Sequence, residues 1–445
     1  DDVARRTLKQ GVGPFTAMNL TGGNPLTFVG LQHYREKIHG WFAPTKLMAD
    51  QMDAGAPWDG VKRGEKPDVP DDVKSKVAER MLGAYFGIVC EILDAGISNV
   101  ADLEMGVQTG LVMAPPFQLM NQVGVGRALE LVESYAADHA GFPVAQCLRD
   151  QATRGTPWEI PVILREDEDG IAVLTIRRPG VLNALNNDVF EQLGNLVDAI
   201  ESDGSVQGAV ITGFGRKAFV SGADIGMLAA VKTPADGEKT SWHSNSILLK
   251  LERCSKPIVC AYNGLAFGGG NELALACHAR IARRGLRLLA GQPEPNLGII
   301  PGAGGSQRLP RVIGFEKANA MLRTGRPVSG PEALECGLIS EEVDGDVVAR
   351  AVEVARTMAA DGFTRINREP IDGVTLADVE LGHLSTAVDG IIVKAIVDGA
   401  KLGLDEGLKF ESKCFGEVCG LEDMRIGMDN FMKNGPRAKA EFVNR

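Results

Sequence analysis

The chain has 445 residues, 44% of them hydrophobic, and a formal net charge of −11 from 47 basic and 58 acidic residues. This length is enough for two or three domains with packed cores. The acidic balance argues against nucleic acid and anionic membrane surfaces as partners, although local basic groups could still bind an anionic small ligand. Nothing resembles a signal peptide, and no apolar run approaches the ~20 residues of a membrane span.

The eight cysteines are scattered, without a C-x-x-C pair or a spacing typical of metal ligands. Scattered thiols in a long chain indicate a reducing compartment, so we expect a cytoplasmic protein with structural cysteines and no metal site. The chain opens on "DDVARRTLKQGVGPF" without an initiator Met, and this opening reads as the middle of a domain.

Two segments within residues 1–158 repeat each other. The first carries "GPFTAMN" and closes on "DAGAPW", and the second carries "PPFQLMN" and closes on "TRGTPW". Phe15 and Phe117 are 102 residues apart, and Trp58 and Trp158 are 100 apart. Near-constant offsets between such residue types indicate a duplication.

Between the two copies, "PDDVKSKVAERMLGAYFGIVCEILDAGISNVADLE" predicts a long helix. Gly96 is expected to end it, and Ser98 or Asn99 to begin the next. Residues 1–158 therefore read as a duplicated all-α domain whose first copy lacks its opening helix. Apolar residues recur at four-residue steps on one face of the long helix, at Val73, Val77, Met81 and Tyr85.

This pattern resembles the C-terminal helical domain of 3-hydroxyacyl-CoA dehydrogenases, present twice. In that family a helix is followed by a D-x-D-like turn and a G-P-F segment, which "SNVADLEMGVQTGLVMAPPF" matches. The family's catalytic Asn lies in an N-R pair, and Glu79 and Arg80 stand in its place here. Because no G-x-G-x-x-G follows a strand, the resemblance implies NAD binding only for an upstream domain missing from this chain. We expect a scaffold and dimerisation unit.

From residue 159 onward, short apolar strands alternate with helices. The runs "GIAVLTI" (170–176), "QGAVIT" (207–212) and "KPIVCAYNG" (256–264) are bounded by turn residues, and 186–202 has helical spacing. This alternation favours an α/β domain with a covered sheet over 159–445, in which the last 120 residues are mostly helical.

Five motifs follow in order in this region. They are "RRPGVLNALN", "AFVSGADI", "NGLAFGGGNELALAC", "GQPEPNLGIIPGAGGSQRLPR" and "TGRPVSGPEALECGL". Together they resemble the crotonase (enoyl-CoA hydratase/isomerase) superfamily. The resemblance implies a ββα spiral domain with C-terminal helices and an acyl-CoA thioester substrate, with coenzyme A as part of the substrate. The whole chain is then of class α+α/β, with an all-α domain first.

Adding water to a conjugated thioester requires stabilisation of the enolate oxygen, which two fixed backbone N–H groups provide. A donor that must approach a ligand closely favours glycine or alanine around it. By the family pattern, the donors are the amides of Ala223 and Gly269, and "GGGNE" could form a tight strand-to-helix turn as well. Asp224, Ile225 and Gly226 are then expected to bind the substrate through their main chain, beside Ala223 and Gly269.

Water addition also needs a base for the water and an acid for C2, and two half-buried carboxyls can divide that work. Glu272 and Glu294 match the family's two hydratase glutamates. Taken singly, Glu272 could be a first-turn helix residue and Glu294 a loop acid. Their separation of 22 residues exceeds the family's usual spacing by two. A surface turn in "RRGLRLLAGQPE" would absorb the extra residues, whereas a shifted strand register would misplace Glu294.

Five further residues are weaker candidates. His278 stands where many relatives have Asp, and we expect a structural role for it. Arg216 and Lys217 are candidates for contacts to the CoA phosphates. Trp242 and Met227 could touch the acyl chain or pack in the core.

The sequence therefore predicts an enoyl-CoA hydratase that belongs to a bifunctional acyl-CoA oxidation enzyme, with no cofactor bound by this chain itself. The alternatives are an enoyl-CoA isomerase or a CoA-thioester hydrolase of the same fold, or a non-catalytic assembly subunit. A homo-oligomer based on trimers is expected, because the segment "GLEDMRIGMDNFMKNGPRAKAEF" reads as a helix with apolar Met and Phe positions that would cover a neighbour.

Overall fold

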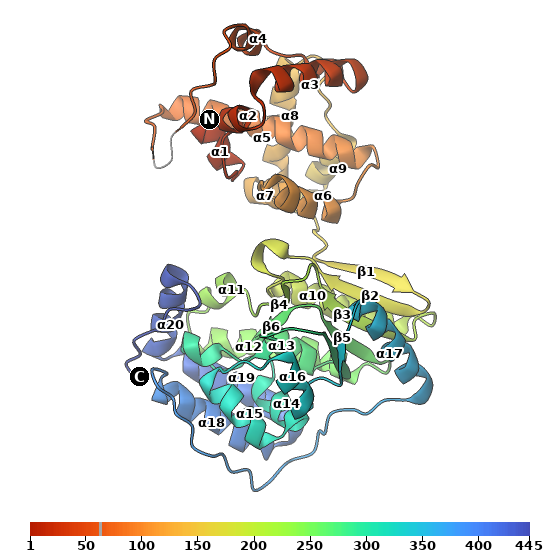
Figure 1. The fold of residues 1–445 in the computed structure, drawn as a ribbon, viewed down its shortest axis with the longest axis vertical. Coiled ribbons are helices and arrows are strands. Elements are labelled where there is room, and N and C mark those ends of the chain that lie inside the picture. Colours follow the sequence, from red (N-terminus) through yellow and green to blue (C-terminus); the bar gives the residue numbers. More distant parts are fainter. Residues whose placement is uncertain (62–64) are drawn as a thin grey trace. The chain divides into compact units, whose positions relative to one another are not determined.

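The computed structural model describes residues 1–61 and 65–445, which form two compact units, Asp1–Pro161 and Val162–Arg445 (Figure 1). The division falls close to the boundary expected between 158 and 159. Throughout the described ranges, no helix is both long and apolar enough to cross a bilayer.

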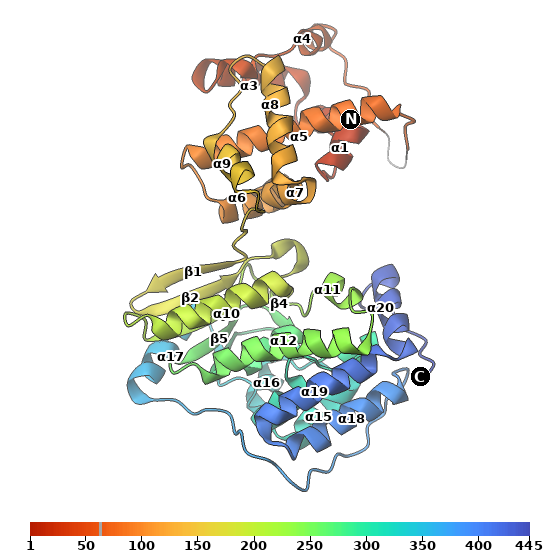
Figure 2. The same ribbon diagram turned by 180° about the vertical axis from the view of Figure 1, so that it is seen from behind.

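The first unit is built from helices, and the second combines sheets with many helices (Figure 2). In the first unit the helices are α1 (Asp2–Thr7), α2 (Pro14–Leu20), α3 (Gly23–Lys37), η1 (Gly40–Phe42), α4 (Lys46–Asp53), α5 (Asp71–Asp94), α6 (Val100–Gly106), η2 (Val107–Leu111), α7 (Pro116–Val123), α8 (Val125–Asp138) and α9 (Gln146–Arg154).

The duplicated sequence forms a duplicated local structure. Asn19 donates from Nδ2 to the carbonyl of Trp58 over 2.8 Å, and its Oδ1 accepts the Trp58 N–H over 2.9 Å. Asn121 and Trp158 repeat both bonds, over 3.0 Å and 2.8 Å. Each copy thus binds its closing Trp through the asparagine of its repeated motif.

Helix α5 confirms the long helix expected between the copies, and it packs against α8 in the core of this unit. Phe86 of α5 and Phe117 of α7 are completely buried there. Gly96 has φ +64°, a conformation that glycine adopts without strain, and the helix has ended by that point. Asn99 caps α6 by accepting the N–H of Asp102 over 2.9 Å.

The second unit contains nine strands. They are β1 (Ile163–Glu168), β2 (Ile171–Ile176), β3 (Gly208–Gly213), β4 (Ala218–Val220), β5 (Ile258–Tyr262), β6 (Leu265–Phe267), β7 (Ala279–Arg283), β8 (Ala290–Gly291) and β9 (Glu341–Val343). The helices are η3 (Pro179–Val181), α10 (Asn187–Ser202), α11 (Ile225–Ala229), α12 (Pro234–Arg253), α13 (Gly269–Leu275), η4 (Glu294–Leu297), α14 (Gly305–Ile313), α15 (Phe315–Thr324), α16 (Gly330–Cys336), α17 (Val347–Asp361), α18 (Thr386–Ala400), α19 (Gly403–Cys419) and α20 (Glu422–Asn434).

Two sheets organise this unit. The larger has the order β1-β2-β3-β5-β7-β9, with β1 antiparallel to β2 and all other neighbours parallel. The smaller has the order β4-β6-β8, all parallel. The predicted strands β2, β3 and β5 are buried along their length and lie next to one another, because parallel strands between helices lose both faces to the core. Helix α17 packs on one face of the large sheet.

The C-terminal region differs from the mostly helical expectation in one stretch. Residues 362–385 between α17 and α18 form a long irregular connection (Figure 1). Its arginines hold it to the body of the unit. Arg365 donates to the carbonyls of Glu252 and Cys254 over 2.8 and 2.7 Å, and Arg368 forms ion pairs with Glu252 and Asp405.

Candidate active site

A cavity of about 740 Å³ opens in the second unit. Ala223, Gly269, Glu272 and Glu294, which sequence motifs far apart in the chain predict as site residues, all line it. The small sheet explains this convergence, because β4, β6 and β8 lie side by side and each is followed by one of these segments.

Among the residues that the structure describes, the backbone N–H groups of Ala223 and Gly269 have no acceptor, and both residues line this wall. Leu185 bridges to Ala223, but the bonds run from the Leu185 N–H to Gly222 and from the Asp224 N–H to Leu185. Gly269 is the first residue of α13, a position whose N–H has no acceptor within its helix. A Cβ built on Gly269 would lie 3.5 Å from the amide nitrogen of Ala223, so the two peptide groups are neighbours.

The backbone conformation of Gly268 and its close approach to Glu294 require a glycine at the start of the triplet. Its φ of +51° lies in the region that disfavours other residues, and it turns the chain from β6 into α13. A Cβ at this position would lie 2.6 Å from Oε1 of Glu294. The triplet is therefore a strand-to-helix turn, and it also lets backbone approach the second glutamate.

Glu272 is buried in α13, and its Oε1 accepts the N–H groups of Ala303 and Gly305 over 2.8 and 2.7 Å. Burial raises the pKa of Glu272 to about 8, and repulsion from the carboxyl of Glu411 adds to the rise. The two amide bonds oppose it, because they favour the ionised form.

Glu294 begins η4 and is also buried. Its Oε2 has no hydrogen-bond partner among the residues that the structure describes. Burial holds the pKa of Glu294 well above its usual range, and the nearby Glu272 raises it further. The turn between β7 and β8 is exposed, and β8 pairs with β6 at Phe267 and Gly291, which fits the surface-turn alternative.

The segment after Ala223 lines the cavity only in part. Asp224 and Ile225 belong to the lining, but Gly226 does not. The N–H of Gly226 donates to Oδ1 of Asp224 over 2.9 Å, because Asp224 caps α11. The other oxygen of Asp224 pairs with Arg178 over 2.9 Å. Of the expected main-chain contacts, those from the amides of Asp224 and Gly226 are thus already used by the fold.

Of the weaker candidates for substrate contact, one lines the cavity and three do not. Met227 lines the cavity, whereas Trp242 packs against a small apolar cluster beside α19. Arg216 and Lys217 are exposed in the turn before β4 and are not part of the lining.

His278 has structural partners. Its Nδ1 lies 2.9 Å from the backbone nitrogen of Ile258, which donates to it, and its Nε2 lies 3.1 Å from the carbonyl oxygen of Glu252. Burial lowers the pKa of His278 to about 4, so the ring stays neutral near neutral pH.

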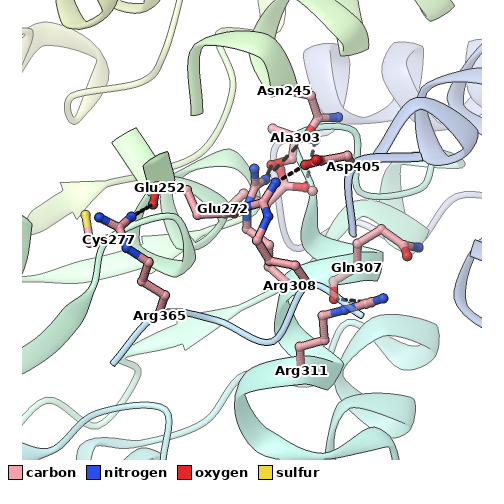
Figure 3. Close-up of polar contacts among 12 residues, drawn as sticks. Asn245, Glu252, Glu272, Cys277, Ala303, Gln307, Arg308, Arg311, Arg365 and Asp405 are labelled. Atoms are coloured by element: carbon pink, nitrogen blue, oxygen red, sulfur yellow. Dashed lines mark hydrogen bonds and ion pairs between the residues drawn. The ribbon is translucent and has the colours of Figure 1, made fainter. Parts of the chain in front are cut away.

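A buried polar network backs the cavity (Figure 3). Arg308 donates to Oε2 of Glu252 over 2.8 Å, to the carbonyl of Ala303 over 3.0 Å and to Asn245 over 3.3 Å. Figure 3 places Glu272 in the same group of side chains, next to Ala303 and Arg308. The network fixes the loop that supplies the amides to Glu272.

Sequence reasoning missed Glu411, a completely buried carboxyl on α19 that contacts the same loop. A signal was present, because Glu411 continues an apolar helical stripe. The stripe consists of Leu404, Leu408 and Phe415, all of which are buried. A carboxylate on such a stripe is rarely buried unless it is paired with donors.

Comparison with known proteins agrees with this geometry. The family model described as Enoyl-CoA hydratase/isomerase matches residues 166–368. The chain is 35% identical to the short-chain-enoyl-CoA hydratase of Clostridium acetobutylicum, over 64% of this chain and 100% of that protein. It is 32% identical to the crotonyl-CoA hydratase of Syntrophomonas wolfei, over 64% of this chain and 98% of that protein. The chain therefore belongs to the enoyl-CoA hydratase/isomerase family.

A third relative is much longer. The fatty acid oxidation complex subunit alpha of Idiomarina loihiensis is 32% identical over 56% of this chain, and the match covers 38% of that protein. The matched part is thus a little over a third of this relative's length.

Proposed function

We propose that the protein adds water across the C2=C3 double bond of an enoyl-CoA thioester and yields a 3-hydroxyacyl-CoA. One observation carries the proposal: two buried carboxyls with raised pKa values and two uncommitted N–H groups line a single cavity. The similarity of the chain to an enoyl-CoA hydratase over 100% of its length and to a crotonyl-CoA hydratase over 98% of its length supports it.

The N–H groups of Ala223 and Gly269 would hold the thioester oxygen. As water adds to C3, negative charge develops on this oxygen, and donors that are fixed beforehand stabilise it without reorganisation. Apolar residues that include Ile299, Ile300 and Phe415 surround the cavity, and a dry environment strengthens these bonds.

The two carboxyls differ in their hydrogen bonds, and this difference assigns their roles. Glu272 accepts two amide bonds that favour its ionised form, so it loses its proton first and acts as the base. Glu294 has an oxygen without a donor among the described residues, so it keeps its proton and acts as the acid.

The step balances in atoms and charge. Glu272 takes one proton from water while the water oxygen bonds to C3, and C2 receives the proton of Glu294. Glu272 ends protonated and Glu294 ionised, and proton exchange with solvent then restores both.

We assign residues 1–158 to a duplicated helical domain like that of 3-hydroxyacyl-CoA dehydrogenases, with the hydratase domain over 159–445. The repeated Asn–Trp bonds support the duplication, and the similarity to a fatty acid oxidation complex subunit alpha supports the link to acyl-CoA oxidation. NAD would bind only to a domain outside this chain, and coenzyme A enters as part of the substrate.

We also propose a trimer-based homo-oligomer in the cytoplasm. All eight cysteines are free thiols, which fits a reducing compartment. In α20, Met424 and Met428 are buried within their own chain, whereas Met432 is 55% exposed and remains available to a neighbour. The apolar face that the sequence assigns to a neighbour is thus largely covered already.

The experiment is a hydration assay with crotonyl-CoA and with longer enoyl-CoAs, followed by the loss of the conjugated thioester's ultraviolet absorbance. The proposal requires hydration that disappears in Glu272→Gln and Glu294→Gln. A matched control is Glu104→Gln, because Glu104 is a buried glutamate of the helical unit that accepts the Gln118 amide over 2.7 Å. Absence of hydration by the folded wild-type protein would refute the proposal.

A further inference from the structure

Glu411 holds the loop that supports Glu272. Its Oε1 accepts the N–H of Gly304 over 2.6 Å. Its Oε2 accepts the N–H and the hydroxyl of Ser306 over 2.9 and 2.6 Å. Asn245 adds a fourth donor over 3.3 Å. Glu411 is absent from the cavity lining, so it would act on substrate only through its neighbours.

The two carboxyls bind alternate amides of this loop. Glu272 accepts from Ala303 and Gly305, and Glu411 accepts from Gly304 and Ser306. Consecutive Cα atoms lie only about 3.8 Å apart, so both carboxyls hold neighbouring peptide groups of one short segment. Releasing either carboxyl therefore frees the segment that positions the other.

The number of donors decides which of the two carries charge. Four donors on Glu411 favour its carboxylate form, although burial raises the pKa of Glu411. Glu272 has two amide donors and faces the Glu411 charge. The other ionisable groups near Glu272 are Glu294, which keeps its proton, and Arg308, which is paired with Glu252. Among the groups near Glu272, Glu411 is therefore the one whose charge is not balanced by an ion-pair partner.

We propose that Glu411 is a positioning residue for Glu272: it fixes the 303–306 loop so that two amides stay on the Glu272 carboxyl, and it places a second carboxylate against that carboxyl. The catalytic consequence rests on the proposed hydratase function, because it concerns the proton affinity of the base. The claim that Glu411 holds the 303–306 loop in place does not depend on that function.

The test follows the titration of Glu272 itself by infrared difference spectroscopy of the full chain. The Glu272 carboxyl band is the one that disappears in Glu272→Gln. In Glu411→Gln, a near-isosteric change that removes the charge, the midpoint of Glu272 should move to lower pH, because a repelling neighbour has been lost. The acid limb of the pH profile for crotonyl-CoA hydration should move in the same direction. A purely structural loosening of the 303–306 loop would instead take the amide donors away from Glu272 and move both to higher pH.

A second variant covers the case in which Glu411→Gln does not fold. Ser306→Ala removes the hydroxyl that donates to Glu411 over 2.6 Å, which makes the Glu411 carboxylate less favourable, so it should move the Glu272 midpoint in the same direction as Glu411→Gln does. The matched control is Asp423→Asn, which alters another fully buried carboxyl with backbone donors, from Val443 and Asn444 over 2.7 and 2.9 Å. It should leave the Glu272 midpoint unchanged.

The outcomes separate the two claims. Midpoints that move as described, with no hydration by the wild-type protein, would overturn the proposed function and leave the positioning role standing. Midpoints that stay fixed in an active enzyme would overturn the positioning role alone. An equal movement of the Glu272 midpoint in Asp423→Asn would also overturn it, since any loosening of the core would then suffice.

Discussion

Gly268 and Glu294 are in close contact, although one belongs to the strand-to-helix turn before α13 and the other begins η4. A side chain of even one carbon on Gly268 would lie 2.6 Å from Oε1 of Glu294. The glycine triplet and the acidic loop are therefore parts of one site, and the glycine at 268 is required both by its φ of +51° and by its neighbour.

Gly268→Ala should abolish most of the hydratase activity and lower the free energy of unfolding by about 1–3 kcal/mol, the usual cost of a strained backbone conformation. Gly285→Ala is the matched control, because Gly285 has φ +84° but nothing within 4 Å of its added carbon. The control should lose stability without losing turnover. Thermal melts and crotonyl-CoA hydration measure the two effects, and equal activity of the two variants would contradict the contact's importance.

The pH dependence of stability should reveal the buried Glu272. Its pKa is about 8 in the folded protein, against 4.5 for an ordinary glutamate. Between these values the folded state binds more protons than the unfolded state, so the free energy of unfolding falls as pH rises through the folded pKa. Glu272→Gln removes this loss. The melting temperature of the variant relative to wild type should therefore increase from pH 5 to pH 9, and a constant difference would argue against the raised pKa.

Several elements could be predicted from the sequence because their signals are local. Periodic apolar residues identify α5, and continuous β-branched runs identify β2, β3 and β5. The strand β1 carries charged residues on an exposed edge, so its pattern is weak. Residues 362–385 are held by arginine contacts to a distant helix, which no local pattern reports.

The candidate site residues could be proposed from sequence motifs, whereas for Glu411 the sequence offers only its place on an apolar helical stripe and does not show which loop it contacts. Ala223, Gly269, Glu272 and Glu294 sit in short motifs that resemble those of a known family, and the resemblance implies their roles. The contact of Glu411 with 303–306 joins α19 to the start of α14, and it depends on how the helices pack. The use of the Gly226 amide by Asp224 likewise depends on the cap of α11.

The purified chain should not bind NADH, because no dinucleotide-binding fingerprint occurs in its sequence. Fluorescence titration with NADH checks this, with a 3-hydroxyacyl-CoA as the positive control for the cavity. Saturable NADH binding would contradict the assignment of dinucleotide binding to a domain outside the chain.

The chain should form a homo-oligomer based on trimers. Light scattering at micromolar concentration should give a mass that is a multiple of three chains, with one chain at 47.4 kDa. Met432→Lys places a charge on the exposed face of α20 and should weaken the assembly if that face meets a neighbour. A monodisperse monomer of the wild-type protein would contradict this prediction.

The central claim is that Glu272 and Glu294 act together as base and acid, and the measurement that tests it most directly is crotonyl-CoA hydration by Glu272→Gln and Glu294→Gln. Each change keeps the shape of the side chain and removes its proton. Each should lower turnover by about 10²–10⁴-fold, and the double variant should lose less than the product of the two.

Melting temperatures near neutral pH serve as the control for folding. Loss of turnover in both folded variants is the predicted result. A folded single variant that keeps near-wild-type hydration would contradict the two-carboxyl mechanism, and inactivity of Glu294→Gln alone would favour an isomerase.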